Sequence, residues 1–432
     1  MTEPKYSFLP YLNLSFLLLF VAANGAQLVH EKRVLSLQKL RWHREGHASS
    51  CLPKKSKWEK GATILEIKHT GSCSSSRSTN TDDKIQKLKE QLVLDKYRTE
   101  WLQSQIKTNT STISYKEDAG IPLTSGLKLQ TLNYVVTVGL GGQNKTLIMD
   151  TGSDLTWVQC QPCSLCYNQQ GPLFDPSSSP TYQLVPCTTP TCQSLRSASG
   201  NPGICNGNAC NYIVRYGDGS YTRGELGTEK LSLGSTTVDK FVFGCGRNNK
   251  GLFGKASGLI GLGRSQLSLV SQTQSLFGGV FSYCLPTTDA GASGSLVLGG
   301  NSTLYKNTTP ISYTRMIQIP QNPSFYFVNL TSITIGGVPI ESPSFGQKVL
   351  FDSGTVITRL PPSLYKALKA EFLRQFSGFP SAPGFVILDT CFDLSKYQEI
   401  DVPTMKLHFE GDEAELVVDL LGMFYIAKDD AS

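Results

Sequence analysis

Two copies of one short pattern, each centred on an aspartate, are the strongest chemical signal in the sequence. Residues 147–153 read LIMDTGS and residues 349–355 read VLFDSGT, so Asp150 and Asp352 each follow three apolar residues and stand 202 positions apart. Average composition gives on the order of a few hundredths of an Asp-[Thr/Ser]-Gly-[Ser/Thr] match in a chain of this length. One copy alone is typical of a surface turn, but a repeat with one copy in each half indicates two related lobes.

The repeat predicts a pair of carboxyl groups that share one proton. Each apolar run is predicted to form a buried strand that ends at its aspartate. The glycine two residues later permits a tight turn there. If the two turns meet, like charges at short range cannot both ionise, so one pKa falls and the other rises. The ionised carboxyl can then take a proton from water while the protonated one polarises a peptide carbonyl, without a metal or a cofactor. Hydroxyl groups in these turns can orient the carboxylates, and the supporting residues that we expect are Thr151, Gly152, Ser153, Ser353, Gly354 and Thr355.

Other catalytic chemistries have less support in the sequence. Four of the five histidines lie within the first 69 residues and only His408 lies beyond them, so a Ser–His or Cys–His mechanism lacks a base. The spacing of Cys160, Cys163 and Cys166 could suit a zinc or cluster site, but no histidine lies in that cysteine-rich stretch. We therefore predict no metal site.

The elements that must position the two aspartates are predicted to be mostly strands. The 432 residues include 40 Gly and 22 Pro, which favours short strands and turns over long helices. Residues 134–138 and 146–149 are predicted strands, and residues 212–222 read as a hairpin around Gly-Asp-Gly. Residues 160–210 are rich in Cys, Pro, Ser and Asn and are predicted to form a loop insertion. The expected fold class is mostly β.

The first quarter of the chain has a different composition. Residues 14–23 read LSFLLLFVAA and precede small residues, which predicts a signal peptide ending at residue 25 and too short to span a bilayer. Residues 26–126 hold 18 Lys or Arg against 11 Asp or Glu, whereas residues 127–432 hold 21 against 22. This split argues against a nucleic-acid-binding body and favours a detachable basic propeptide over a disordered leader. Within it, residues 63–68 predict a strand, and a helix is expected to begin at Thr81.

A secretory route would also explain the twelve cysteines, because disulfides form in oxidising compartments. The disulfide candidates are Cys160, Cys163, Cys166, Cys187, Cys192, Cys205, Cys210 and Cys245, with the pairing left open. Sequons identify the glycosylation candidates Asn144, Asn301, Asn307 and Asn329.

From Asn133 to its end, the chain resembles the pepsin-like (A1-type) aspartic proteases, and in particular their plant secreted, nepenthesin-like subgroup. The two aspartate motifs match the catalytic motifs of that family. Trp157 falls at the position of a tryptophan that hydrogen-bonds the flap tyrosine, and residues 216–220, which include Tyr216 and Gly217, resemble the flap hairpin with Tyr216 as its tyrosine. Leu259-Ile260-Gly261 resembles the strand that completes the first catalytic loop, and the cysteine-rich stretch resembles the insertion of the subgroup.

The resemblance implies a two-lobed fold with the active site between the lobes. Its expected parts are a signal peptide at 1–25, a propeptide at 26–126, an N-terminal catalytic lobe at 127–310 and a C-terminal lobe at 311–432. In the second lobe Leu420-Leu421-Gly422 fits the required strand pattern only superficially, and ten residues follow it. We therefore expect an incomplete, truncated second lobe of low activity. In the family the cysteine at the Cys391 position pairs with one further along the chain, so a free thiol is expected among Cys284 and Cys391.

The function expected is that of an aspartic endopeptidase, made as a secreted zymogen and acting outside the cell in the apoplast, with the vacuole as the alternative. It would bind peptide or protein substrates in extended form and would be inhibited in cis by its own propeptide. A monomer without nucleic acid, membrane anchor or cofactor is expected. Two alternatives remain open: a weakly active or inactive binding protein on the same fold, like the plant xylanase inhibitors, which typically lack an intact pair of aspartates, or a truncated gene product without function.

Overall fold

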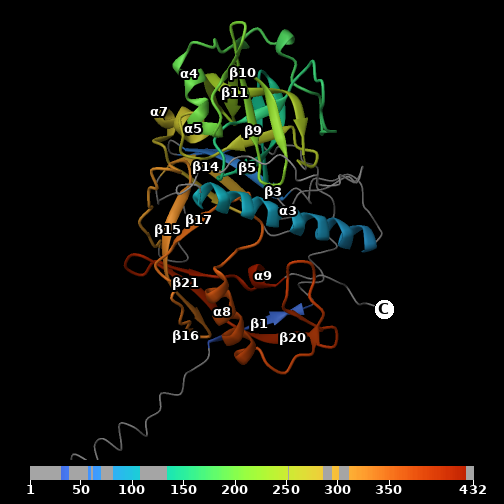
Figure 1. Ribbon diagram of the computed structural model, residues 1–432, viewed down its shortest axis with the longest axis vertical. Helices are drawn as coiled ribbons and strands as arrows, with labels where there is room; N and C mark the ends of the chain where they lie inside the picture. The colour runs from blue at the N-terminus through green and yellow to red at the C-terminus, as the bar shows by residue number, and fades with distance from the viewer. Residues whose placement is uncertain are drawn as a thin grey trace, which may run out of the picture.

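The structure, a computed structural model, describes residues 31–37, 57–59, 62–69, 81–107, 134–251, 253–285, 294–300 and 311–424. Strands predominate in these residues, as the composition predicted. Figure 1 shows one group of strands in the upper half of the molecule and a second group in the lower half, with the long helix α3 (Thr81–Lys107) between them. No helix in the described part of the chain is both long and apolar enough to cross a lipid bilayer.

The upper half is built on one sheet of 13 strands. Its core hairpin, β4 (Tyr134–Leu140) and β5 (Gln143–Asp150), turns at Gly141 and Gly142, whose φ angles of 55° and 78° are left-handed and suit a two-residue turn. Most apolar side chains of both strands pack into the main hydrophobic core, and Val135 and Ile148 pack into a second one. In hydrogen-bonded order the strands are β13 (Phe281–Cys284), β14 (Gly294–Gly299), β3 (Ala62–His69), β4 (Tyr134–Leu140), β5 (Gln143–Asp150), β12 (Gly258–Gly261), β6 (Trp157–Gln159), β11 (Thr236–Lys250), β10 (Tyr221–Leu233), β9 (Ala209–Arg215) and β8 (Ile204–Asn206), with β2 (Lys57–Glu59) beside β3 and β7 (Gln183–Leu184) beside β10.

The short helices of the upper half lie in its connections; they are η2 (Pro176–Ser178), α4 (Pro190–Gln193), α5 (Leu195–Ser199), α6 (Leu269–Gln272) and α7 (Gln274–Phe277). The lower half centres on β15 (Tyr326–Ile335), which pairs with three strands, and helix α8 (Pro362–Gln375) packs Leu364 against Ile333 and Ile335 of β15. Its elements are β15 (Tyr326–Ile335), β16 (Val338–Pro339), β17 (Lys348–Phe351), α8 (Pro362–Gln375), β18 (Ser381–Ala382), β19 (Cys391–Phe392), β20 (Glu399–Pro403), β21 (Met405–Phe409), β22 (Glu415–Val417) and α9 (Leu420–Met423).

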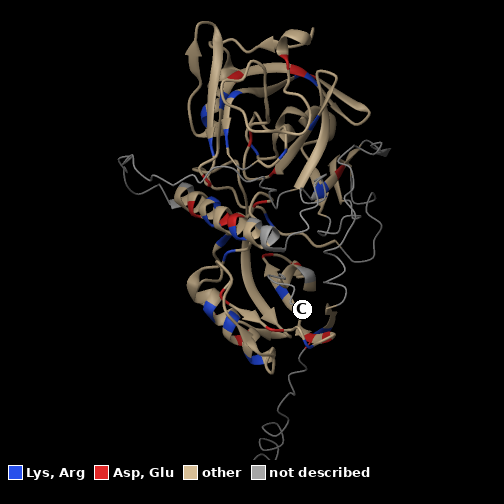
Figure 2. Ribbon diagram, turned by 90° about the vertical axis from the view of Figure 1, so that its right-hand side faces the viewer, with Lys and Arg blue, Asp and Glu red and all other residues tan. Residues whose placement is uncertain are grey.

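The basic N-terminal segment contacts both halves and the region between them. Strand β1 (Lys32–Ser36) pairs antiparallel with β20 in the lower half, and β3 lies between β14 and β4 in the upper sheet. The predicted strand at residues 63–68 and the helix beginning at Thr81 are thus confirmed. Figure 2 shows charges of both signs along α3, whose sequence holds six basic and five acidic residues. The basic surplus of the segment therefore lies mostly outside its helix.

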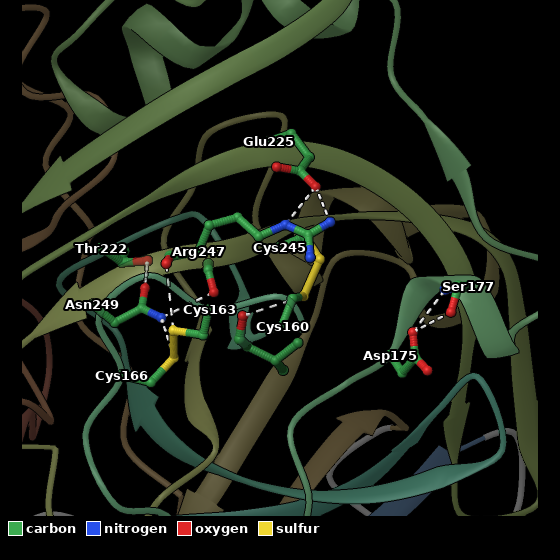
Figure 3. The surroundings of a disulfide bond; sticks show 12 residues. Cys160, Cys163, Cys166, Asp175, Ser177, Thr222, Glu225, Cys245, Arg247 and Asn249 are labelled. Carbon is green, nitrogen blue, oxygen red and sulfur yellow. Dashed lines mark hydrogen bonds and ion pairs between the residues drawn. A yellow bond between two sulfur atoms is a disulfide. The ribbon is translucent and has the colours of Figure 1, made fainter.

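The cysteine-rich stretch is held by disulfides. The eight candidate cysteines form the pairs Cys160–Cys245, Cys163–Cys166, Cys187–Cys205 and Cys192–Cys210. Figure 3 shows the first two pairs close to Arg247, whose guanidinium forms an ion pair with Glu225. Cys284 and Cys391 are free thiols, as predicted, while Cys51 and Cys73 lie outside the described residues.

The glycosylation candidates differ in their surroundings. Asn144 is exposed in the β4–β5 hairpin. Asn329 is half-buried on β15, and its side-chain nitrogen donates a hydrogen bond of 2.9 Å to Glu410 Oε2. Asn301 and Asn307 lie outside the described residues. Of the two described sequons, the one at Asn144 is the more accessible.

The position of β3 leads to a prediction about stability. Ile67 is fully buried in the main core, so Ile67→Ala in the full chain should remove about 2–4 kcal/mol from the free energy of unfolding, because it leaves a cavity. Val34→Ala on β1 is the control, since Val34 is 63% exposed and its truncation should change stability by less than about 0.5 kcal/mol. Denaturant unfolding measures both, and equal stability of the two variants would contradict a structural role for β3.

Candidate active site

The first aspartate turn is held by strands on both sides. Asp150 ends β5, and Gly261 of β12 pairs with it in parallel register, as the Leu259-Ile260-Gly261 pattern predicted. The backbone N–H of Gly152 donates to Asp150 Oδ1 at 3.0 Å, and Ser153 Oγ donates to Oδ2 at 2.7 Å. Both carboxylate oxygens are therefore fixed by groups of the same turn.

The second turn repeats this geometry on a strand with fewer neighbours. Asp352 follows β17; Gly354 N–H donates to its Oδ1 at 3.0 Å, and Thr355 Oγ1 donates to its Oδ2 at 2.5 Å. Among the described strands β17 pairs only with β15. Leu420-Leu421-Gly422, the superficial match to a completing strand, lies in helix α9 instead.

Reciprocal hydrogen bonds join the two turns to each other. Thr151 N–H donates to Ser353 Oγ at 3.1 Å, and Ser353 N–H donates to Thr151 Oγ1 at 2.9 Å. Ser353 Oγ also donates to the carbonyl of Met149 at 3.1 Å. Residues that occupy equivalent places in the two sequence motifs thus make equivalent bonds across the interface.

The glycines of the motifs allow this close approach. A Cβ on Gly152 would lie 2.5 Å from Asp352 Oδ1, and a Cβ on Gly354 would lie 2.6 Å from Asp150 Oδ1. Such distances are shorter than van der Waals contact, so any larger side chain would separate the two turns. The structure therefore brings together the two carboxyl groups that the repeat predicted to share a site.

A hairpin of β9 and β10 lies over these turns at the position predicted for the flap. Trp157 Nε1 donates a hydrogen bond of 2.8 Å to the hydroxyl of Tyr216, and both side chains are buried. Burial raises the pKa of Tyr216 well above its ordinary value, so its hydroxyl stays protonated. At the tip of the hairpin, Gly217 has no room for a Cβ, because Trp101 and the Cα of Arg98 lie against it.

Helix α3 occupies the space between the hairpin and the aspartates, and Arg98 contacts both carboxyl groups. Its Nη2 lies 2.7 Å from Asp150 Oδ1 and 2.9 Å from Asp352 Oδ1, and its Nε lies 2.9 Å from Asp352 Oδ2. The Arg98 side chain is 15% exposed and the two aspartate side chains are 1% and 2% exposed. One guanidinium thus contacts both acids in a site nearly closed to solvent.

The electrostatics of this cluster follow from burial and from the contacts of Arg98. Burial lowers the pKa of Arg98, but the two aspartates outweigh it and keep that pKa above its ordinary value. Burial raises the pKa of Asp150, and the neighbouring Asp352 charge adds to this effect against the opposing charge of Arg98. Burial alone would raise the pKa of Asp352 as well, but the charge and hydrogen bonds of Arg98 outweigh burial there, so the pKa of Asp352 is lowered. The two carboxyls are therefore inequivalent, as their shared position requires.

Two further contacts fix α3 beside the second turn. Asp95, one helical turn before Arg98, accepts hydrogen bonds from the N–H groups of Val356 and Ile357 and forms an ion pair of 2.7 Å with Arg359. On the same side Leu102 and Trp101 pack against an apolar group in the lower half, formed by Ile317, Ile319, Phe325, Phe327 and Leu350.

Sequence reasoning identified the paired aspartates, their supporting residues and the hairpin, but it missed Arg98, Asp95 and Arg359. The pattern of apolar residues in α3 did contain a signal for Asp95. The buried residues of α3 include Leu88, Leu92, Asp95 and Leu102, so an acidic residue interrupts the apolar stripe of the helix. Nothing in the sequence distinguishes Arg98 from the other basic residues of the segment.

The mostly β architecture and its paired aspartate turns define a pepsin-like fold, and comparison with known proteins agrees. The family model "Xylanase inhibitor N-terminal" matches residues 134–300, and "Xylanase inhibitor C-terminal" matches residues 325–431. These domains are part of the pepsin-like aspartic protease family, to which the chain belongs.

Individual relatives are consistent with this assignment. The chain is 40% identical over 393 residues to an aspartyl protease family protein of Arabidopsis thaliana, which covers 88% of this chain and 81% of that protein. It is 36% identical over 296 residues to the aspartic proteinase nepenthesin-1 of Nepenthes gracilis, covering 65% of this chain and 64% of that protein. Among solved structures, basic 7S globulin from soybean superposes with a TM-score of 0.53 at 21% identity, over 66% of this chain and 77% of that one, which shows likeness of fold.

A third carboxyl group, Asp154, lies in the first turn. Its Oδ1 accepts a hydrogen bond of 2.8 Å from Ser265 N–H, and the residue is 2% exposed. Burial raises the pKa of Asp154 from 3.8 to about 6, although the hydrogen bond from Ser265 opposes this. The folded state therefore holds the proton of Asp154 more tightly than the unfolded chain does, so the contribution of Asp154 to stability is fully present below pH 3.8 and is lost as the pH rises through about 6.

We expect Asp154→Asn to flatten this dependence, because Asn keeps the acceptor oxygen and never ionises. The difference between 3.8 and about 6 corresponds to about 3 kcal/mol. Between pH 4 and pH 7 the wild-type protein should therefore lose a few kcal/mol more of its free energy of unfolding than the variant. Urea unfolding at the two pH values measures the change, and identical losses would show that Asp154 does not titrate in this range.

Proposed function

We propose that this protein is an aspartic endopeptidase that hydrolyses peptide bonds by general acid and base activation of water. The observation that carries the proposal is the geometry of Asp150 and Asp352, each fixed by equivalent groups and held together by the Thr151–Ser353 bonds. In the absence of Arg98 the pair would hold a single proton, with one carboxylate to accept a proton from water and one acid to polarise the carbonyl. The intact pair favours an enzyme over a binding protein of the same fold.

The substrate would be a peptide bound in extended form beneath the β9–β10 hairpin. That hairpin lies over the aspartates, and it could close on a peptide and exclude water from it. The apolar group that receives Leu102 would be available to an apolar side chain of the substrate. We assign no metal and no cofactor to this reaction.

We further propose that the protein is made as a zymogen, with a signal peptide at 1–25, a propeptide at 26–126 and secretion to the apoplast. The support lies in α3, which occupies the space that a substrate would need, and in Arg98, which hydrogen-bonds both carboxyl groups. The lobes proposed at 127–310 and 311–432 would form the mature enzyme. Acid would weaken the inhibition, because protonated aspartates no longer attract Arg98.

The first test is the loss of activity in Asp150→Asn and Asp352→Asn. Each change removes one partner of the acid and base pair, so cleavage of casein by acid-treated protein should fall by at least about 10²–10⁴-fold. Wild-type activity should peak at acid pH and decline as the shared proton is lost, in assays from pH 2 to 8. Asp239→Asn is the control, since the Asp239 side chain is 78% exposed and, among the described residues, forms an ion pair only with the half-exposed Lys230. Undiminished activity in either dyad variant would refute the mechanism.

A second test separates Arg98 from the general charge of its segment. Arg98→Gln leaves α3 without its contact to the aspartates, so the full-length variant should become active, and should bind a peptide transition-state analogue, at a pH about one unit higher than the wild type. Lys96→Gln removes the same charge two residues away, where the side chain is 55% exposed, and should leave the activation pH unchanged. Equal shifts in the two variants would show that bulk charge, not Arg98, closes the site.

A further inference from the structure

The carboxylate of Asp95 occupies a small site in the lower half that is built to hold an anion. Its Oδ1 accepts from Val356 N–H, and its Oδ2 accepts from Ile357 N–H at 3.2 Å and lies 2.7 Å from Arg359 Nη1. The Asp95 side chain is 1% exposed and that of Arg359 is 24% exposed. We call these three donors, the two backbone N–H groups and the Arg359 guanidinium, the 356–359 cradle.

The cradle directly follows the second aspartate motif and therefore lies beside the catalytic centre. Its first donor, Val356 N–H, belongs to the residue after Thr355, which bonds the carboxylate of Asp352. On α3 Asp95 stands three residues before Arg98, which corresponds to about 4.5 Å along a helix axis. In an extended peptide, which rises about 3.3 Å per residue, the same distance is one to two residues.

The cradle is preorganised by its own loop. Arg359 Nη1 also donates to the carbonyl of Ile357, which holds the guanidinium beside the two N–H groups. Arg359 Nη2 is buried and has no acceptor among the described residues. Within the same residues the N–H groups of Val356 and Ile357 donate only to Asp95. When α3 leaves, the cradle would present unpaired donors and a cation next to the substrate, an arrangement that favours a new anionic partner.

We propose that in the mature enzyme the 356–359 cradle is a subsite for an acidic side chain of the substrate, and that Asp95 stands in for this side chain in the zymogen. This inference rests on the proposed peptidase function and on removal of α3. The preferred substrates are peptides with Asp or Glu about one to two residues from the scissile bond. Arg359 is then a specificity-determining residue, because a guanidinium and two N–H groups bind a carboxylate better than an uncharged amide.

The test uses acid-activated protein and a series of fluorogenic peptides that differ at one position. A single Asp or Asn is placed in turn at each of the first four positions on either side of the scissile bond, and kcat/KM is measured at pH 5, where aspartate in a peptide is ionised. At one position, or at two adjacent ones, Asp should exceed Asn by about tenfold, mainly through KM. In Arg359→Gln the Asp-to-Asn ratio at that position should fall to about one, whatever happens to overall activity.

Each outcome decides the matter. If all peptides are cleaved but Asp and Asn are equivalent at every position, or if Arg359→Gln keeps the wild-type ratio, the cradle is only an anchor for the zymogen and the inference is wrong. If Arg359→Gln does not fold, the wild-type series still decides, and Arg359→Lys, which keeps the charge but loses the planar fork, should retain part of the preference. Failure to cleave any peptide would instead contradict the proposed function, and this inference with it.

Discussion

Two carboxyl groups buried against each other are the constraint on which the rest of the structure depends. Charge in a buried site is unfavourable unless it is paired and hydrogen-bonded, and the two aspartate side chains are 1% and 2% exposed. Each turn supplies a backbone N–H and a hydroxyl to its own carboxylate, and the Thr151–Ser353 bonds keep the two turns at a fixed separation. Because the turns are fixed in this way, a single guanidinium can reach both acids at once.

The N-terminal segment holds that guanidinium in place through contacts far from the aspartates. β1 pairs with β20 in the lower half, β3 is a member of the upper sheet, and α3 lies between the halves. Leu35 and Leu37 are buried with Phe376, Ile400 and Val402, so the attachment to the lower half is apolar as well as hydrogen-bonded. A group tethered at two places meets its site at a high effective concentration, so Arg98 need not bind tightly by itself to remain in position.

The sequence was a better guide to the two aspartates than to the arginine and the helix that cover them. Asp150 and Asp352 could be found because the same local pattern occurs twice, and the strands around them could be found because their apolar and β-branched residues form short runs between turn residues. Arg98 could not be found, because its role depends on where a helix lies relative to turns 52 and 254 positions away, and no local pattern encodes that. The excess of basic residues drew attention to residues 26–126, and this segment does cover the aspartates. Net charge is only part of the reason, because the charges of α3 itself are nearly balanced. Leu420-Leu421-Gly422, which matched the completing strand only superficially, lies in a helix: two leucines and a glycine fit the end of a short helix as well as a strand, and only the surrounding chain decides.

The place of β3 in the upper sheet also has a consequence for the order of events when the chain folds. β3 pairs with β4 across some 70 positions of sequence and with β14 across some 230. Because β3 is synthesised first, both of its edges can be paired only after β14 has been made. Contacts of such long range make folding slow and leave strand edges open in the meantime. A chain from which β3 had been removed would lack the template between β4 and β14. Once unfolded, such a chain would have no direct route back to its native form.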